Sequence, residues 1–81
     1  MATFDLGKEI SLAREFATQV HGEYVQYLRK HGISESDSGN QFAVNASELW
    51  KARDLAFKCE SEADVSKLKE RISELLKEIR A

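Results

Sequence analysis

Apolar residues in the first third of the chain recur at steps of three and four, a spacing that places side chains on one face of an α-helix. The pattern predicts a long helix over about 5–31. Arg29 and Lys30 put positive charge on its last turn, where the helix dipole favours it. Gly32 can take the left-handed conformation that closes many helices, and Ile33 can supply the accompanying apolar contact. The apolar face consists of Leu6, Ile10, Ala13, Ala17, Val20, Tyr24, Tyr27 and Leu28.

Gly22 lies inside this predicted helix. Glycine costs about 1 kcal/mol relative to alanine in a helix interior. It marks a kink or the close approach of another backbone, or it is simply a glycine that the helix tolerates. The sequence leaves these alternatives open.

A polar segment with the sequence SESDSGN follows at 34–40 and competes with helix formation through local hydrogen bonds. We expect a loop over about 33–44. Asn45 and Glu48 have the spacing of a capping box, which predicts that a second helix starts near Asn45, with an earlier start near Gly39 as the alternative. This helix is expected to reach about Glu60. Its broad apolar face comprises Leu49, Trp50, Ala52, Ala56, Phe57 and Cys59.

A third helix is predicted over about 62–80, with Ser61 and Asp64 as a second, weaker capping pair. Its apolar positions form a strict heptad seam: Val65, Leu68, Ile72, Leu75 and Ile79. β-branched residues at one heptad position and leucine at the other favour a parallel two-stranded coiled coil. The same seam can equally pack against the first helix within one chain. The seam does not continue in phase before residue 60, which favours a bend between the second and third helices.

The composition agrees with a small helical protein. The chain has 81 residues, no proline, 42% hydrophobic residues and a formal net charge of −2. These values exclude a disordered chain, and no apolar run approaches the about 20 residues that a membrane span needs. We expect one all-α domain over 1–81, a small helical bundle with a long N-terminal helix, a polar loop and two C-terminal helices. Because so short a chain has a small core, we also expect a homodimer.

The sequence offers no convincing catalytic or metal-binding set. Cys59 is the single cysteine, and no base or oxyanion site is recognisable beside it. His21 and His31 lie about 15 Å apart on a continuous helix and cannot share a metal ion. We interpret His21 as a half-buried packing residue. The expectation is a non-enzymatic protein with no cofactor and no metal.

Nucleic-acid binding is the alternative function. Lys51, Arg53 and Lys58 accompany Trp50 on the second helix, and the helix order superficially fits a small helical DNA-binding transcriptional regulator. Interleaved acidic residues oppose phosphate binding, and the loop is longer than the turn of a helix-turn-helix motif.

Trp50 and Phe57 are seven residues apart and share one side of the second helix. They belong either to the core or to a site that anchors a partner, because tryptophan is enriched in binding hot spots. Our leading hypothesis is a protein-binding regulator or adaptor that docks an apolar helical face, centred on these aromatics or on the 65–79 seam, against a larger protein. The first residues lack the features of a signal peptide, so we expect a cytoplasmic protein.

Overall fold

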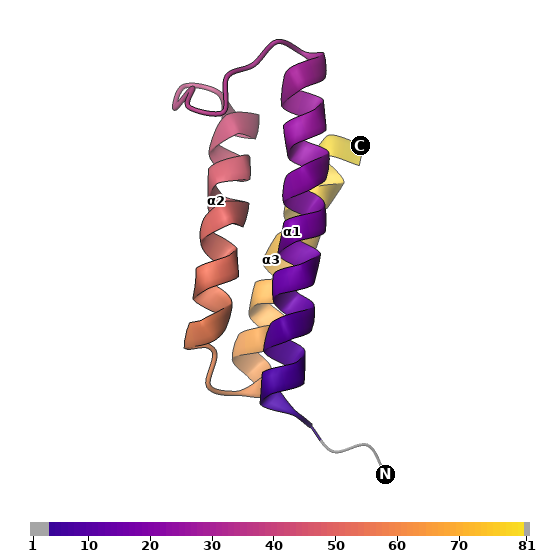
Figure 1. Cartoon of the computed structure of the whole chain (residues 1–81), viewed down its shortest axis with the longest axis vertical. Coiled ribbons are helices and arrows are strands. Elements are labelled where there is room, and N and C mark those ends of the chain that lie inside the picture. Colours follow the sequence, from indigo (N-terminus) through magenta and orange to yellow (C-terminus); the bar gives the residue numbers. More distant parts are fainter. Residues whose placement is uncertain (1–3, 81) are drawn as a thin grey trace.

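The computed structural model describes residues 4–80, which form three α-helices and one short 3₁₀ turn (Figure 1). The helices are α1 (Leu6–Lys30), α2 (Gln41–Leu55) and α3 (Glu62–Arg80), and the turn η1 (Ala56–Lys58) follows α2 directly. They run up, down and up in Figure 1, so α1 and α3 point the same way and α2 points the opposite way. The prediction of an all-α bundle with a long N-terminal helix is confirmed. Within residues 4–80, no helix is long and apolar enough to cross a membrane.

The end of α1 has the cap that the sequence predicts. Gly32 takes a positive φ of 65°. Its N–H donates to the carbonyl oxygen of Arg29 at 3.2 Å, and the N–H of Ile33 donates to that of Leu28 at 2.8 Å. This pair of bonds is the Schellman motif, which satisfies carbonyls that the helix end would leave free. Ile33 also packs against the core, so the predicted apolar contact is present.

The start of α2 corrects the prediction from sequence. The helix begins at Gln41, four residues before Asn45, so the loop ends at residue 40 and not at 44. Asn40 is the actual cap, and its side-chain oxygen accepts from the backbone N–H of Phe42 at 2.9 Å and of Ala43 at 3.3 Å. The earlier start near Gly39, which the sequence left open, is closer to the observed one. Asn45 is buried within the helix and serves another purpose.

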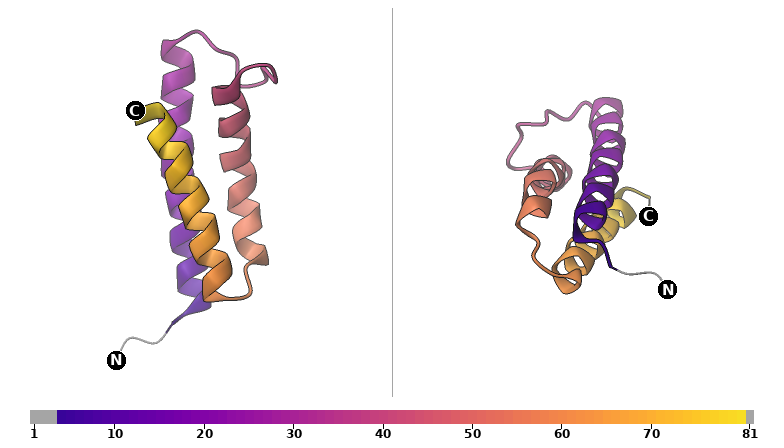
Figure 2. Two further views of the ribbon diagram at one scale, coloured as in Figure 1. Left: turned by 180° about the vertical axis from the view of Figure 1, so that it is seen from behind. Right: turned by 60° about the horizontal axis from the view of Figure 1, so that its bottom comes forward.

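The predicted bend between the second and third helices is confirmed. The chain tightens into η1 and turns at 59–61 before α3 begins (Figure 2). Ser61 and Asp64 form the predicted capping pair: the Ser61 hydroxyl accepts from the N–H of Asp64 at 3.3 Å. The Asp64 carboxylate accepts from the N–H of Glu60 at 3.0 Å. These bonds fix where the third helix starts.

The heptad seam of α3 lies inside the chain. Val65, Ile72 and Leu75 are buried, while Leu68 and Ile79 are half-buried and pack against the core. Of the two alternatives for the seam, the structure shows packing within one chain. Val65, Ile72 and Leu75 are therefore inaccessible to a partner. This corrects the prediction that they belong to a protein interface. The homodimer stays a prediction. The heptad seam, which was the main argument for it in the sequence, packs against other helices of the same chain.

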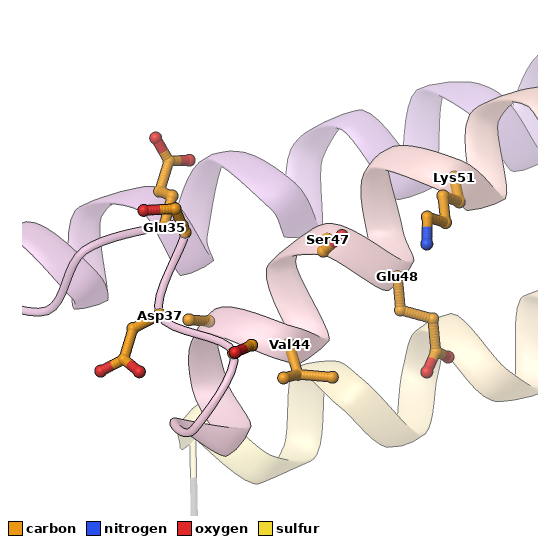
Figure 3. Close-up of a pocket in the computed structure, with 9 residues that line it drawn as sticks. Glu35, Asp37, Val44, Ser47, Glu48 and Lys51 are labelled. Carbon is orange, nitrogen blue, oxygen red and sulfur yellow. The ribbon is translucent and has the colours of Figure 1, made fainter.

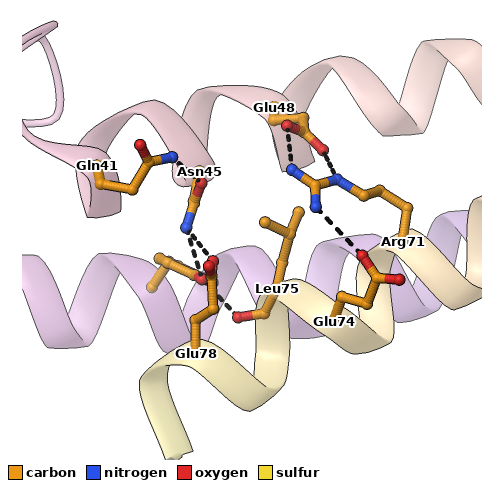
Figure 4. A network of polar contacts seen from close by, with 8 residues as sticks. Gln41, Asn45, Glu48, Arg71, Glu74, Leu75 and Glu78 are labelled. Carbon is orange, nitrogen blue, oxygen red and sulfur yellow. Dashed lines mark hydrogen bonds and ion pairs between the residues drawn. The ribbon is translucent and has the colours of Figure 1, made fainter.

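A polar network crosses this apolar core (Figure 4). The Tyr24 hydroxyl on α1 donates to the carbonyl oxygen of Leu75 on α3 at 2.5 Å and accepts from the Asn45 amide of α2 at 3.2 Å. The same amide nitrogen donates to the Glu78 carboxylate at 2.5 Å, and Gln41 donates to the Asn45 oxygen at 2.8 Å. One hydroxyl and one amide thus connect all three helices. Burial raises the pKa of Tyr24, which keeps its hydroxyl protonated as a donor.

Ion pairs at the rim add to the attachment of α3. Arg71 makes a bidentate pair with Glu48 of α2, with its Nε at 2.5 Å and an Nη at 3.0 Å from the two carboxylate oxygens (Figure 4). This pair raises the pKa of Arg71. Lys69 and Arg80 bind carboxylates of α1 at 2.7 and 3.0 Å. Because these groups are partly exposed, each pair contributes about 1 kcal/mol or less.

Of the alternatives for Gly22, the structure supports a glycine that the helix simply tolerates. It lies on the exposed side of α1, which continues through it without a break. A Cβ built on Gly22 would meet no other atom within 4 Å. Neither a kink nor a close backbone approach therefore requires this glycine.

We predict that Asn45→Ala lowers the free energy of unfolding by about 1–3 kcal/mol, because it leaves buried polar groups without partners. Urea denaturation followed by circular dichroism measures the change. Ser47→Ala, at an exposed position of the same helix, is the control and is expected to shift stability by less than about 0.5 kcal/mol. Equal stabilities of the two variants would contradict the role given to the network.

The two helix glycines are expected to respond in opposite directions. Gly22→Ala raises the free energy of unfolding by about 0.5–1 kcal/mol, because alanine restricts the unfolded chain and fits the helix. Gly32→Ala lowers it by about 1–2 kcal/mol, because an alanine at positive φ is strained. The same urea titrations measure both, and a loss of stability in Gly22→Ala would show that this position is not open.

Candidate functional site

Two large aromatic side chains lie outside the core. Trp50 is 58% exposed and Phe57 is 61% exposed. Trp50 lies in the second half of α2 and Phe57 in η1, and each ring contacts a side chain of α1, His21 and Arg14 respectively. Large aromatic side chains carry about 150–250 Å² of surface that is normally removed from water, so two exposed rings make this region a candidate interaction surface. Of the two alternatives that the sequence left open, the structure excludes the core.

Arginine side chains cover part of each exposed ring. The guanidinium carbon of Arg53 lies 4.9 Å from the centre of the Trp50 ring, and that of Arg14 lies 4.2 Å from the centre of the Phe57 ring. Both distances are within the range of a cation–π interaction. Arg14 belongs to α1, and its Nε donates to the carbonyl oxygen of Arg53 at 3.2 Å. These contacts join the two helices along one face.

His21 extends this face toward the loop. Its ring centre lies 5.4 Å from that of Trp50, at an angle of 49° between the planes. The half-buried packing position expected for His21 is the one observed. We define the aromatic–arginine strip as the continuous surface formed by His21, Trp50, Arg53, Arg14 and Phe57.

A shallow hollow borders the strip between α1 and α2. It is lined by Ser11, Arg14, Glu15, Thr18, Gln19 and Arg53. Neither arginine is within ion-pair distance of a carboxylate in the part of the chain that the structure describes. The Nε of Arg53 is buried and has no hydrogen-bond partner. Two positively charged side chains therefore line this hollow, whereas the Arg53 Nε itself is enclosed.

The residues of the alternative nucleic-acid site do not gather into one basic surface. Arg53 is directed onto Trp50 as part of the strip. Lys51 lines a separate hollow between the loop and α2, together with Glu35, Asp37 and Glu48 (Figure 3). Lys58 is exposed in η1. Since three acidic side chains line the same hollow as Lys51, this region is a poor match for a phosphate backbone.

The cysteine lacks the setting of a nucleophile. Burial raises the pKa of the Cys59 thiol, and nearby Asp64 adds to this shift. The thiol donates to the carbonyl oxygen of Leu55 at 3.9 Å. A reactive cysteine needs a lowered pKa and an adjacent base, so these surroundings favour a structural thiol. Among residues 4–80, no group of three potential ligands could hold a metal ion.

Arg14 is the residue of the strip that the sequence analysis missed. It lies seven residues before His21 and therefore on the same side of α1, next to the apolar face. Trp50 and Phe57 have the same separation on the facing segment. Two matched pairs at heptad spacing, one on each helix, were the available signal. The sequence alone does not show that the two pairs face each other.

Comparisons with protein-family models, with curated proteins and with solved structures find no match for this chain.

We predict that the strip contributes little to folding. Trp50→Ala and Phe57→Ala are each expected to change the free energy of unfolding by less than about 1 kcal/mol, since they remove one exposed ring and one cation–π contact. Leu49→Ala is the matched core control in α2 and is expected to cost about 2–5 kcal/mol. Urea denaturation of the three variants checks this contrast. A loss in Trp50→Ala as large as that in Leu49→Ala would make Trp50 a structural residue.

Proposed function

We propose that the protein is a non-enzymatic regulator or adaptor that docks on a larger protein through the aromatic–arginine strip. The observation that carries this proposal is the exposure of Trp50 and Phe57, at 58% and 61%, on one continuous face. Tryptophan and arginine are the residue types most enriched in protein-binding hot spots, whereas lysine and glutamate are depleted at the centre of interfaces.

The distribution of apolar surface supports this choice of face. The α3 seam and the apolar face of α1 are both used within the chain, where they form the core. The other large apolar side chains that are exposed are less exposed than these two rings: Phe4 at 45%, Leu12 at 42%, Val44 at 40% and Leu55 at 46%. The strip is therefore the surface with the most apolar area to gain from a partner.

The strip is also partly organised before binding. Each arginine is held over a ring, and Arg14 is further held by its bond to the Arg53 carbonyl. A side chain that is already ordered loses less conformational entropy when it enters an interface, which leaves more of the contact energy for binding. The mechanism is occlusion: the strip docks into a groove of the larger protein and prevents other molecules from binding there.

Affinity purification followed by reconstitution tests the proposal. A partner captured from cells and identified by mass spectrometry is purified, and its affinity is measured by isothermal titration calorimetry. Trp50→Ala and Phe57→Ala are each expected to cost about 2 kcal/mol of binding free energy, as hot-spot residues do. Circular dichroism must show that both variants keep their helix content.

Leu12→Ala and Val44→Ala are the matched controls, because they remove exposed apolar side chains away from the strip. They are expected to bind as the unchanged protein does. If the controls weaken binding as much as Trp50→Ala, or if the purified partner binds Trp50→Ala normally, the strip is not the docking surface and the proposal fails.

A further inference from the structure

We infer that the segment which the strip recognises is acidic: an Asp- or Glu-containing stretch of the partner protein whose carboxylates bind Arg14 and Arg53 while an adjacent apolar side chain covers Trp50 or Phe57. The inference rests on the proposed function and adds the chemistry of the partner. Its basis is the charge that the strip leaves uncompensated.

Arg14 and Arg53 differ in this respect from the arginines that hold α3. Arg71 pairs with Glu48 and Glu74, and Arg80 pairs with Glu23. No carboxylate of residues 4–80 lies within ion-pair distance of either strip arginine. Arg29 also has no carboxylate within ion-pair distance among residues 4–80, but Arg14 and Arg53 are the unpaired arginines that lie against aromatic rings.

The geometry of the two strip arginines suits a carboxylate. An aromatic ring contacts each guanidinium, and this contact does not itself use the N–H donors of the guanidinium. Arg14 uses its Nε internally and retains its two Nη groups. The Nε of Arg53 is buried, so a partner's carboxylate reaches this side chain through its Nη groups. Arginine–carboxylate pairs are frequently bidentate and stronger than neutral hydrogen bonds.

The adjacent hollow gives such a segment a polar wall. Ser11 and Gln19 line it beside the two arginines and offer a hydroxyl and an amide to a peptide backbone. The Thr18 hydroxyl donates to the carbonyl oxygen of Arg14 at 2.9 Å and can still accept a hydrogen bond. Glu15 is the single acidic residue of this lining and disfavours a second carboxylate at its own end. One or two carboxylates near the arginines, followed by an apolar residue, fit this arrangement better than a long acidic run.

A nucleic acid fits less well, although aromatic rings beside arginines can stack on bases. Tight binding to a phosphate backbone draws on several cations that follow the strand. The strip supplies two arginines, and Lys51 lies away from it beside Glu35, Asp37 and Glu48 (Figure 3). The chain as a whole carries a net charge of −2. We therefore assign the surface to an acidic protein segment.

A random peptide library displayed on phage tests the inference without knowledge of the natural partner. The full-length protein is the bait, and peptides that bind it better than the Trp50→Ala/Phe57→Ala double variant are retained. We expect the retained sequences to be enriched in Asp and Glu next to large apolar residues. One such peptide is then synthesised, with a second version in which amides replace its carboxylates.

Calorimetry with these peptides isolates the role of charge. The acidic peptide is expected to bind the Arg14→Gln/Arg53→Gln variant at least about tenfold more weakly than the unchanged protein, with a similar loss for the amide version. Arg29→Gln is the matched control, because it removes an exposed arginine at the other end of α1, and it is expected to bind normally. Circular dichroism confirms that all variants remain folded.

The outcomes separate the two proposals. Retained peptides without acidic residues, or equal affinity for the Arg14→Gln/Arg53→Gln variant, overturn the acidic segment but leave docking at the strip intact. No peptide preferring the unchanged protein over the Trp50→Ala/Phe57→Ala variant overturns both. A single-stranded oligothymidylate that binds more tightly than the acidic peptide, and is lost with the two arginines, makes the strip a nucleic-acid surface and also overturns both.

Discussion

The fold depends on how the Tyr24 hydroxyl is satisfied in the middle of the core. A buried hydroxyl without partners costs several kcal/mol in an apolar surrounding. Here a backbone carbonyl of α3 accepts its proton and an amide of α2 donates to it. The apolar contacts among the helices are non-directional, whereas these hydrogen bonds require a defined position of each partner. The network therefore selects the alignment in which the helices face each other.

This alignment creates the strip. Arg14 and His21 come from α1, whereas Trp50 and Arg53 come from α2, and none of them forms a surface until the two helices lie side by side in the observed register. A shift of one residue along either helix would turn these side chains by about a quarter of a turn. The buried network and the proposed binding surface therefore use different residues, although the bond from Arg14 to the Arg53 carbonyl also links the two helices.

Local signals predicted most of the architecture. The long first helix, the Gly32 cap, the bend near 60 and the third helix all follow from periodicity and short-range capping chemistry. The predicted start of α2 was wrong, because Asn45 and Glu48 have the spacing of a capping box but do not cap the helix. Asn45 donates to Tyr24 and Glu48 accepts from Arg71, and both partners are distant in sequence. For the same reason, the sequence could not decide between packing within the chain and dimerisation for the seam of α3. The seam packs against α1, and the periodicity of one helix does not show which helix it contacts. Trp50 and Phe57 were predicted as residues either of the core or of a binding site, and the sequence could not show their exposure because it depends on which side of α2 meets α1.

The placement of Trp50 also affects how this protein can be observed. It is the one tryptophan of the chain, and it lies half in water on the strip rather than in the core. Its fluorescence is therefore expected to respond to a molecule that covers the strip and to respond much less to changes in the packing of the core. The two tyrosines lie on α1, where Tyr24 is buried and Tyr27 is half-buried against Phe42. The chain thus carries separate native chromophores for its surface and its interior.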